Sequence, residues 1–232
     1  MKNPELPSRA ASNSNVDLYL NEVRGISMAT IREWEKRDLL YEDEKRNAVF
    51  VGRDFDGNAK YYHLKGTGEE RYMHDAPSEI SDKTTAVSFD NAKARHLYVT
   101  EAAVDAMSLQ DILGGADRLK DSSFLSLQSV SNTRALARYL ATRDTSNLED
   151  IMICTDADEA GERCVKNLMA VIDDLKLNKK LPESVSARRI APKPGFKDFN
   201  DELKASVLKT KQASLQKSPT LQIDRGVGLN MT

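Results

Sequence analysis

The segment Ile151–Gly161, with the sequence IMICTDADEAG, indicates the class of fold that the rest of the chain is expected to adopt. Its first four residues are apolar, which is typical of a strand buried on both faces of a parallel sheet. The apolar run stops at two aspartates, Asp156 and Asp158, and a long segment with helical periodicity follows Gly161. Acidic residues at the carboxyl end of such a strand lie where open α/β sheets bind their ligands. We therefore expect a functional site at this strand end.

The two aspartates are separated by one residue, so both carboxylates can point to the same side of the chain. Neighbouring carboxylates suit Mg²⁺, which takes one or two protein carboxylates and keeps its other positions for water and phosphate oxygens. Mn²⁺ accepts the same ligands. The simpler alternative is that Asp158 caps the following helix and Asp156 is a turn residue. The DxD spacing alone leaves both interpretations open.

Composition indicates an ordinary globular protein. The chain has 232 residues, of which 40% are hydrophobic and 30% charged, enough for one large or two small domains. No apolar run is long enough for a membrane span or a signal peptide, so we expect no membrane association and a cytoplasmic location. Cys154 and Cys164 lack partners at zinc-ligand spacing and are expected to be buried free thiols. The formal net charge of −2 neither indicates nor excludes a nucleic-acid partner.

The N-terminal part of the chain is predicted to form a small α+β subdomain over residues 16–94, after a disordered segment over residues 1–15. Its expected elements are a helical hairpin, a β-hairpin, an irregular connection and a short strand. These elements are predicted over residues 16–24 and 28–40, 47–65, 66–83 and 84–89. Ser27 is expected to cap the second helix, Gly25 to end the first, and Asp56-Gly57 to form the turn of the β-hairpin.

The pattern then changes to alternating strands and helices, which indicates a parallel sheet. We predict an α/β domain over residues 95–205, with a mainly parallel four-stranded sheet flanked by helices. The strands are expected over residues 97–101, 123–128, 151–157 and 186–192. The helices are expected over residues 102–113, 131–142 with Ser131 as its cap, 161–177, and from about Asn200. Residues 206–232 are expected to form a loosely attached tail.

Acidic residues follow several of these strands. Glu101 follows the first strand, Asp156 and Asp158 the third, and Asp198 lies in the loop after the fourth. The carboxyl ends of parallel strands share one edge of the sheet, and close carboxylates repel each other unless a cation neutralises them. The acids therefore favour a metal site. Residues 179–197 add a basic margin that favours a phosphate-bearing partner: Lys180, Arg188, Arg189 and Lys193.

Three stretches carry a resemblance to a known family: TEAAVDAMSL, CTDADEAGERC and GFKDFNDEL. They resemble the Toprim domain, a Rossmann-like fold shared by bacterial primases, topoisomerases and some nucleases. The likeness is greatest to the catalytic core of bacterial (DnaG-type) primases, in a compact form like those of phages, plasmids and conjugative elements. The matching positions are Glu101 and Asp105; Asp156, Asp158, Ala160 and Gly161; and Gly195, Lys197 and Asp198.

The resemblance extends upstream to the hairpin VGRDFDGNAKYYHLKG, where Arg53, Lys60 and Lys65 match residues that contact nucleic acid or nucleotide. It implies a Mg²⁺-dependent nucleotidyltransferase that makes short primers on single-stranded DNA from nucleoside triphosphates, in the replication of a chromosome or mobile element. A replicative helicase or a separate template-binding protein would be a partner.

The resemblance also assigns roles to individual residues. Glu101, Asp156 and Asp158 would be catalytic, and the same three acids with Asp198 would hold the metal. Glu101 would assist proton transfer at the attacking 3′-hydroxyl. Lys197 would join the three hairpin residues in binding nucleic acid or triphosphate.

The sequence also departs from the primase pattern. Gln128-Ser129 stands where a glycine-rich turn usually ends the second strand, and Ala157 stands where primases often have glycine. No zinc ribbon and no helicase-binding domain are evident. Two alternatives to a primase therefore stay open. One is a Toprim-type nuclease or strand-processing factor with the same acids, and the other is a non-catalytic nucleic-acid-binding module.

Overall fold

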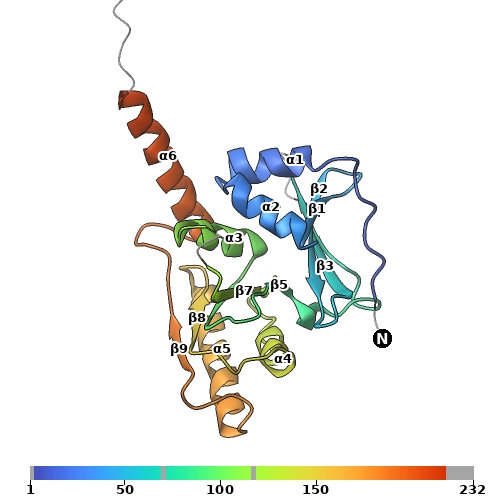
Figure 1. The fold of residues 1–232 in the computed structure, drawn as a ribbon, viewed down its shortest axis with the longest axis vertical. Helices are drawn as coiled ribbons and strands as arrows, with labels where there is room; N and C mark the ends of the chain where they lie inside the picture. Colours follow the sequence, from blue (N-terminus) through green and yellow to red (C-terminus); the bar gives the residue numbers. More distant parts are fainter. Residues whose placement is uncertain (1–2, 69–71, 116–118, 218–232) are drawn as a thin grey trace, which may run out of the picture.

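The computed structural model describes residues 3–68, 72–115 and 119–217, which form two sheets (Figure 1). The N-terminal sheet has four antiparallel strands in the order β1-β2-β3-β4. Its strands are β1 (Leu40–Glu42), β2 (Asn47–Arg53), β3 (Ala59–Gly66) and β4 (Met73–Asp75). The second sheet has five strands in the order β5-β7-β6-β8-β9. They are β5 (Val87–Phe89), β6 (His96–Thr100), β7 (Ser122–Ser126), β8 (Asp150–Cys154) and β9 (Ser186–Arg189).

The predicted helical hairpin is confirmed. α1 (Ser14–Leu18) runs on into a π-helical turn η1 (Tyr19–Val23), and α2 (Met28–Lys36) follows. Gly25, with a φ of +73°, separates them, and the Ser27 hydroxyl accepts a hydrogen bond from the Thr30 N–H at 3.2 Å as the predicted cap. The expected end of α2 near Leu40 is wrong, because Leu40 already pairs with Phe50 in strand β1.

The expected disorder of the N-terminus is wrong for residues 3–15. Residues 8 and 10 bond to the end of β1 and to the turn after it: the Ala10 N–H donates to the Glu42 carbonyl at 2.9 Å, and the Glu44 N–H donates to the Ser8 carbonyl at 3.1 Å. The physical reason is that β1 is an edge strand whose backbone groups need partners. The polar composition of this segment concealed that role.

The predicted β-hairpin is formed by β2 and β3, with Gly57 at a φ of +83° in its turn. The connection after it is not wholly irregular, because it contains strand β4 and a 3₁₀ turn η2 (Lys83–Thr85). β1 and β4 each have three residues, too few for the alternation that would have predicted them.

The four predicted parallel strands are confirmed as β6, β7, β8 and β9. The sheet has a fifth strand that the prediction did not place in it, because β5 pairs antiparallel with β7 at the edge. The helices of this part are α3 (Ala103–Ile112), α4 (Arg134–Thr142), α5 (Glu159–Leu177) and α6 (Phe199–Lys217). Thr133, not Ser131, occupies the N-cap of α4.

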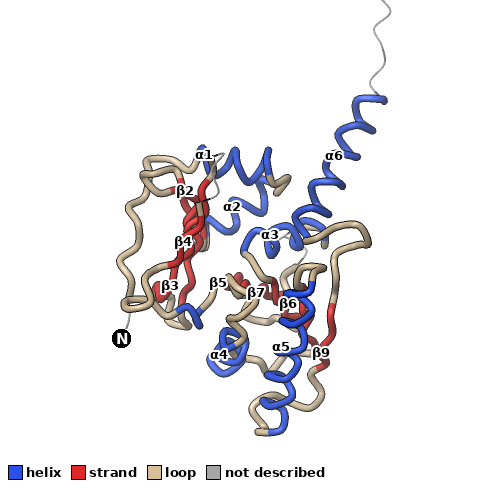
Figure 2. The backbone as a smooth tube through the Cα atoms, turned by 180° about the vertical axis from the view of Figure 1, so that it is seen from behind, coloured by secondary structure: helices blue, strands red, loops and turns tan. Residues whose placement is uncertain are grey.

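Helices cover both faces of the five-stranded sheet. Apolar residues of α4 and α5 pack on one face, and those of α3 and the start of α6 pack on the other. α6 extends away from the body of the molecule (Figures 1 and 2). Its helical end at Lys217 corrects the expected loose tail over residues 206–217, and the remaining tail residues, 218–232, lie outside the described part.

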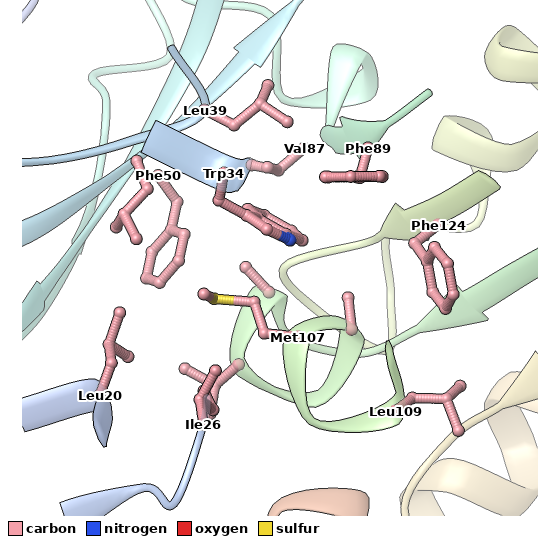
Figure 3. Packing of buried hydrophobic residues seen from close by; sticks show 14 of the residues in the cluster. Leu20, Ile26, Trp34, Leu39, Phe50, Val87, Phe89, Met107, Leu109 and Phe124 are labelled. Carbon is pink, nitrogen blue, oxygen red and sulfur yellow. The ribbon is translucent and has the colours of Figure 1, made fainter. Parts of the chain in front are cut away.

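A cluster around Trp34 joins the two sheets (Figure 3). The Trp34 ring lies between Phe50 of β2 and Phe89 of β5, with ring centroids 6.3 and 5.7 Å away. Its indole N–H donates to Gln110 Oε1 of α3 at 2.7 Å. Gly52 of β2 lies so close to Ala86, just before β5, that a Cβ on Gly52 would be 1.8 Å from the Ala86 carbonyl oxygen. The two parts therefore share one apolar core.

Two other expectations concern the chain as a whole. Cys154 and Cys164 are buried free thiols, as predicted. Over residues 3–68, 72–115 and 119–217, no helix has the length and apolar character needed to cross a membrane.

We expect Trp34→Ala to lower the free energy of unfolding by about 3–5 kcal/mol, because it empties the centre of the shared core and leaves Gln110 Oε1 without its donor. Urea unfolding followed by circular dichroism measures the change. Leu177→Ala, at a side chain that is 81% exposed, is the control and should shift the midpoint little. Equal midpoints for both variants would contradict the shared core.

Candidate metal and catalytic site

The parallel pairing of β6 with β8 brings two acidic residues together. Thr100 and Cys154 lie opposite each other at the carboxyl ends of these strands, so the residues that follow leave the sheet side by side. Glu101 and Asp156 meet there, and the Asp156 N–H donates to Glu101 Oε1 at 3.1 Å. The sheet edge thus brings together two acids that the sequence placed after the first and third predicted strands.

Asp158 has two contacts, one through each carboxylate oxygen. Oδ1 accepts a hydrogen bond from the Gly161 N–H at 2.9 Å and caps α5, as the simpler alternative expected. This hydrogen bond holds the pKa of Asp158 below its ordinary value. Oδ2 lies 3.5 Å from the Lys197 ammonium. Helix capping therefore leaves one oxygen of Asp158 available to a cation.

Gly161 is required by the close approach of the chain before α5. A Cβ at this position would lie 2.1 Å from the carbonyl oxygen of Asp156. The Thr155 hydroxyl donates to the Gly161 carbonyl at 3.2 Å and closes the same turn. The absence of a side chain at Gly161 therefore positions the Asp156 backbone.

The loop before α6 brings a lysine to the acids. The Ala157 N–H donates to the Lys197 carbonyl at 2.7 Å, which ties this loop to the end of β8. The Lys197 ammonium lies 3.5 Å from Asp156 Oδ2 and from Asp158 Oδ2, and the nearby Asp156 charge raises the pKa of Lys197. Asp198 accepts from the Asp201 N–H at 2.7 Å. Lys197 is thus the counter-charge of the acidic edge.

Two carboxyl groups of this edge hold protons more tightly than usual. Burial, followed by the Asp156 charge, raises the pKa of Glu101 to about 7. Burial, followed by the Asp198 and Asp156 charges, raises the pKa of Asp105 to about 8. Burial and the Asp198 charge also raise the pKa of Asp156. The acids are close enough to repel each other, which favours binding of a further cation.

Asp105 is a residue that the predicted catalytic and metal sets left out. It lies in the first turn of α3, is 8% exposed and accepts a hydrogen bond from the Asn200 N–H at 3.4 Å. The sequence did hold a signal for Asp105: it follows Glu101 by four residues, a spacing that can bring the two side chains to the same side of the chain where α3 begins. Asn200 itself had no local signal; its side-chain amide donates to the Arg24 carbonyl and to Ser108 Oγ.

The donor set fits a divalent metal in chemistry, since it consists of carboxylates on a rigid sheet edge. Among the residues that the structure describes, however, no group of three acidic, histidine or cysteine side chains is arranged to hold a metal ion. In the arrangement present, the single Lys197 ammonium offsets part of the charge of Asp156 and Asp158.

Of the four basic residues predicted to bind nucleic acid or nucleotide, the structure brings only Lys197 to the acids. Lys60 is a correction: it is 4% exposed, and its ammonium contacts Asp54 at 3.3 Å and Asn3 at 2.5 Å, so no open surface presents it. Lys65 lies near the end of β3, opposite Ala48 of β2.

Arg53 lies at the turn end of the hairpin, where its guanidinium donates to the Gly57 carbonyl at 2.8 Å. It lines a cavity together with Ala94, which precedes the amino end of β6. The acids lie at the carboxyl ends of the strands, so Arg53 is at the opposite edge of the sheet.

Family models match both parts of the chain. A model described as Toprim-like matches residues 98–203, and a model described as a protein of unknown function (DUF3991) matches residues 18–94. No curated protein sequence is similar enough to count as a match. Residues 98–203 are therefore a Toprim-like region of the chain.

Solved structures of primases share its fold. The primase fragment of the bacteriophage T7 primase-helicase protein has a TM-score of 0.56 at 16% identity, over 84% of this chain and 72% of that one. The primase catalytic core of E. coli has a TM-score of 0.52 at 14% identity, over 88% of this chain and 73% of that one. A DnaG primase catalytic domain bound to single-stranded DNA has a TM-score of 0.53 at 14% identity, over 88% and 71%. The chain is primase-like in fold across both of its parts.

We expect Gly161→Ala to lower the free energy of unfolding by about 1–3 kcal/mol, although alanine ordinarily favours a helix, because its Cβ would press on the Asp156 carbonyl. Thermal unfolding measures the loss. Gly68→Ala is the matched control, since an added Cβ there meets nothing within 4 Å. Equal stability of the two variants would contradict the close turn.

The raised pKa values of Glu101 and Asp105 predict a pH-dependent stability. Both groups bind protons more tightly in the folded chain, so the stabilisation is present below pH 4 and is lost as pH rises through about 7 and 8. For Glu101 the loss is on the order of 3 kcal/mol before solvent screening reduces it.

Melting temperatures from pH 4 to 9 in a metal chelator test this expectation. Glu101→Gln should flatten the decline between pH 5 and 7, whereas Glu183→Gln at an exposed position should leave it unchanged. A wild-type melting temperature that stays constant over this range would be the contrary result.

Proposed function

We propose that this chain is a Mg²⁺-dependent nucleotidyltransferase of the primase type, which makes short primers on single-stranded DNA. The observation that carries the proposal is the group of acids at the carboxyl edge of a Toprim sheet, with the Lys197 ammonium 3.5 Å from two of them. This group occurs in a chain with the fold of primase catalytic cores across both parts. A fold by itself hosts many activities, so the site has to carry the argument.

The metal would be held by Asp156 and Asp158, with Glu101 and Asp198 beside them, and Mn²⁺ could replace Mg²⁺. When bound, the ion would neutralise triphosphate oxygens and the charge that develops during phosphoryl transfer. Burial, followed by the charges of neighbouring carboxylates, raises the pKa values of Glu101 and Asp156, and this crowding of acids supports their role as ligands.

Glu101 is suited to move a proton. With a pKa of about 7, its carboxyl group exists in both protonation states near neutral pH and can accept the proton of a 3′-hydroxyl. Lys197, which is 61% exposed at its side chain, can turn from the aspartates to a triphosphate when a metal takes over their neutralisation. Asp105 remains protonated at neutral pH and positions the start of α6 through Asn200.

Single-stranded DNA and nucleoside triphosphates are the substrates that this function requires. Lys197 would contact the triphosphate, and Arg53 and Lys65 of the β2–β3 hairpin would contact nucleic acid or nucleotide; Lys60 is withdrawn from this set by its burial. A replicative helicase or a template-binding protein would be the partner. A cytoplasmic location and a role in replication of a chromosome or mobile element are part of the same proposal.

Primer synthesis on single-stranded DNA with labelled NTPs and dNTPs, in Mg²⁺ or Mn²⁺, tests the proposal. We expect short products from the wild type and a loss of at least about a hundredfold in Asp156→Asn and Glu101→Gln, because each removes a group that acts on the reacting atoms. Asp173→Asn, at an exposed position on α5, is the matched control and should retain activity.

Three other outcomes would replace this function. Cleavage of the template that is lost in Asp156→Asn would assign a Toprim nuclease. Primer synthesis that persists in Asp156→Asn would show that the reaction takes place outside the acidic edge. Binding of DNA with neither synthesis nor cleavage, also after addition of a helicase, would leave a non-catalytic nucleic-acid-binding module.

A further inference from the structure

A cavity of about 690 Å³ lies at the edge of the sheet opposite the acids. It is bounded by the β2–β3 hairpin turn, the end of β5, the amino end of β6 and the segment after α4, and a second cavity of about 200 Å³ adjoins it. The larger volume is within the range of small-molecule sites, about 300–1,000 Å³. None of the proposed catalytic residues lines either cavity.

Arginines dominate the polar wall of this cavity. Arg143 contacts both cavities, and its Nε is buried without a hydrogen-bond partner among the described residues. Arg37 stacks on Phe89, with its guanidinium carbon 3.7 Å from the ring centroid, and it donates to the Asp90 carbonyl at 2.5 Å and to Asn91 Oδ1 at 3.1 Å. Arg53 contributes a third guanidinium. Guanidinium groups of this kind bind phosphate oxygens in pairs.

The acids of the cavity are already bonded within the protein. Asp90 contacts Arg143 at 3.0 Å and accepts a hydrogen bond from the Tyr139 hydroxyl at 2.8 Å. Asp54 pairs with Lys60 at 3.3 Å, and Asp144 accepts from the Ser146 N–H at 3.0 Å. These acids offset part of the arginine charge, so a site here suits a ligand with a small number of phosphates.

An aromatic ring stands at the mouth of the cavity. Phe55, in the hairpin turn, is 69% exposed, and the Arg143 guanidinium lies 5.9 Å from its ring centroid and 5.7 Å from that of Tyr139. A large apolar side chain exposed at a turn and beside a guanidinium offers a surface on which a nucleobase can stack. Apolar residues Leu39, Leu97 and Leu148 line the interior.

We propose that this cavity binds a free nucleoside phosphate, separately from the acidic edge, with its base against Phe55 and its phosphates on Arg143 and Arg53. The cavity lies between the N-terminal hairpin and the five-stranded sheet, so the bound nucleotide joins the two parts of the chain. Nucleotide binding here thus stabilises their contact, independently of the metal.

Calorimetric titration of the full chain with ADP in a metal chelator tests the proposal, since the chelator suppresses metal-dependent binding at the acids. We expect a single site whose Kd rises at least about tenfold in Phe55→Ala and in Arg53→Met. Asp156→Asn and the exposed Arg163→Met are matched controls that should bind like the wild type. Phe55 is exposed, so its variant should fold; unchanged melting temperatures check this for each variant.

The outcomes separate this site from the proposed catalytic one. Binding lost in Asp156→Asn and kept in Phe55→Ala would place the nucleotide at the acids and overturn the inference. Equal affinities for adenosine and ADP would show that the arginines do not bind the phosphates and would overturn the inference. The absence of ADP binding up to millimolar concentration would overturn it as well. Displacement of ADP by a 5′-phosphorylated oligonucleotide of higher affinity would assign the cavity to a strand end instead of a free nucleotide.

Discussion

The parallel register of β6 and β8 is the constraint on which the acidic site depends. Pairing of Thr100 with Cys154 makes both strands end at the same level, so Glu101 and Asp156 leave the sheet as neighbours. The backbone N–H of one then donates to the carboxylate of the other. A shift of the register by one residue would turn these side chains to the other face of the sheet. The position of the site is therefore fixed by the pairing of the central strands.

Charge balance at this edge connects fold and function. Burial and neighbouring carboxylates raise the pKa values of Glu101 and Asp156, and the fold places Lys197 beside two aspartates through a backbone hydrogen bond to Ala157. In this state Lys197 offsets part of the negative charge of the edge. In the proposed function, a divalent cation held by the acids would displace the exposed Lys197 ammonium, which would then be available to a phosphate.

The contact between the two parts of the chain gives the N-terminal region its role. Trp34, Phe50 and Phe89 form one core across both sheets, and the absence of a side chain at Gly52 permits the backbone of β2 to lie against Ala86. Such a shared core holds the hairpin rigidly against the Toprim sheet. The hairpin turn then bounds the cavity with Arg143 and Phe55, so the packing that joins the parts also shapes the second proposed site.

The sequence by itself determined the parallel sheet, the acids at its strand ends and the free cysteines, because buried strands, helix starts and turns leave local signals of composition and period. It also indicated Asp158 as a helix cap, a role that proved compatible with a place beside Lys197. The family resemblance added the fold of both parts.

Only the tertiary structure decided which of the basic residues face the acids. Lys60, Lys65 and Arg53 share one hairpin in sequence, yet one is buried, one lies near the far end of β3 and one lies at the opposite edge of the sheet. The tertiary structure was also needed to identify the ordered N-terminus and the short strands β1, β4 and β5. The physical reason is that side-chain exposure, edge pairing and the meeting of Asn200 with Asp105 arise from contacts between residues distant in the chain, which no local pattern records.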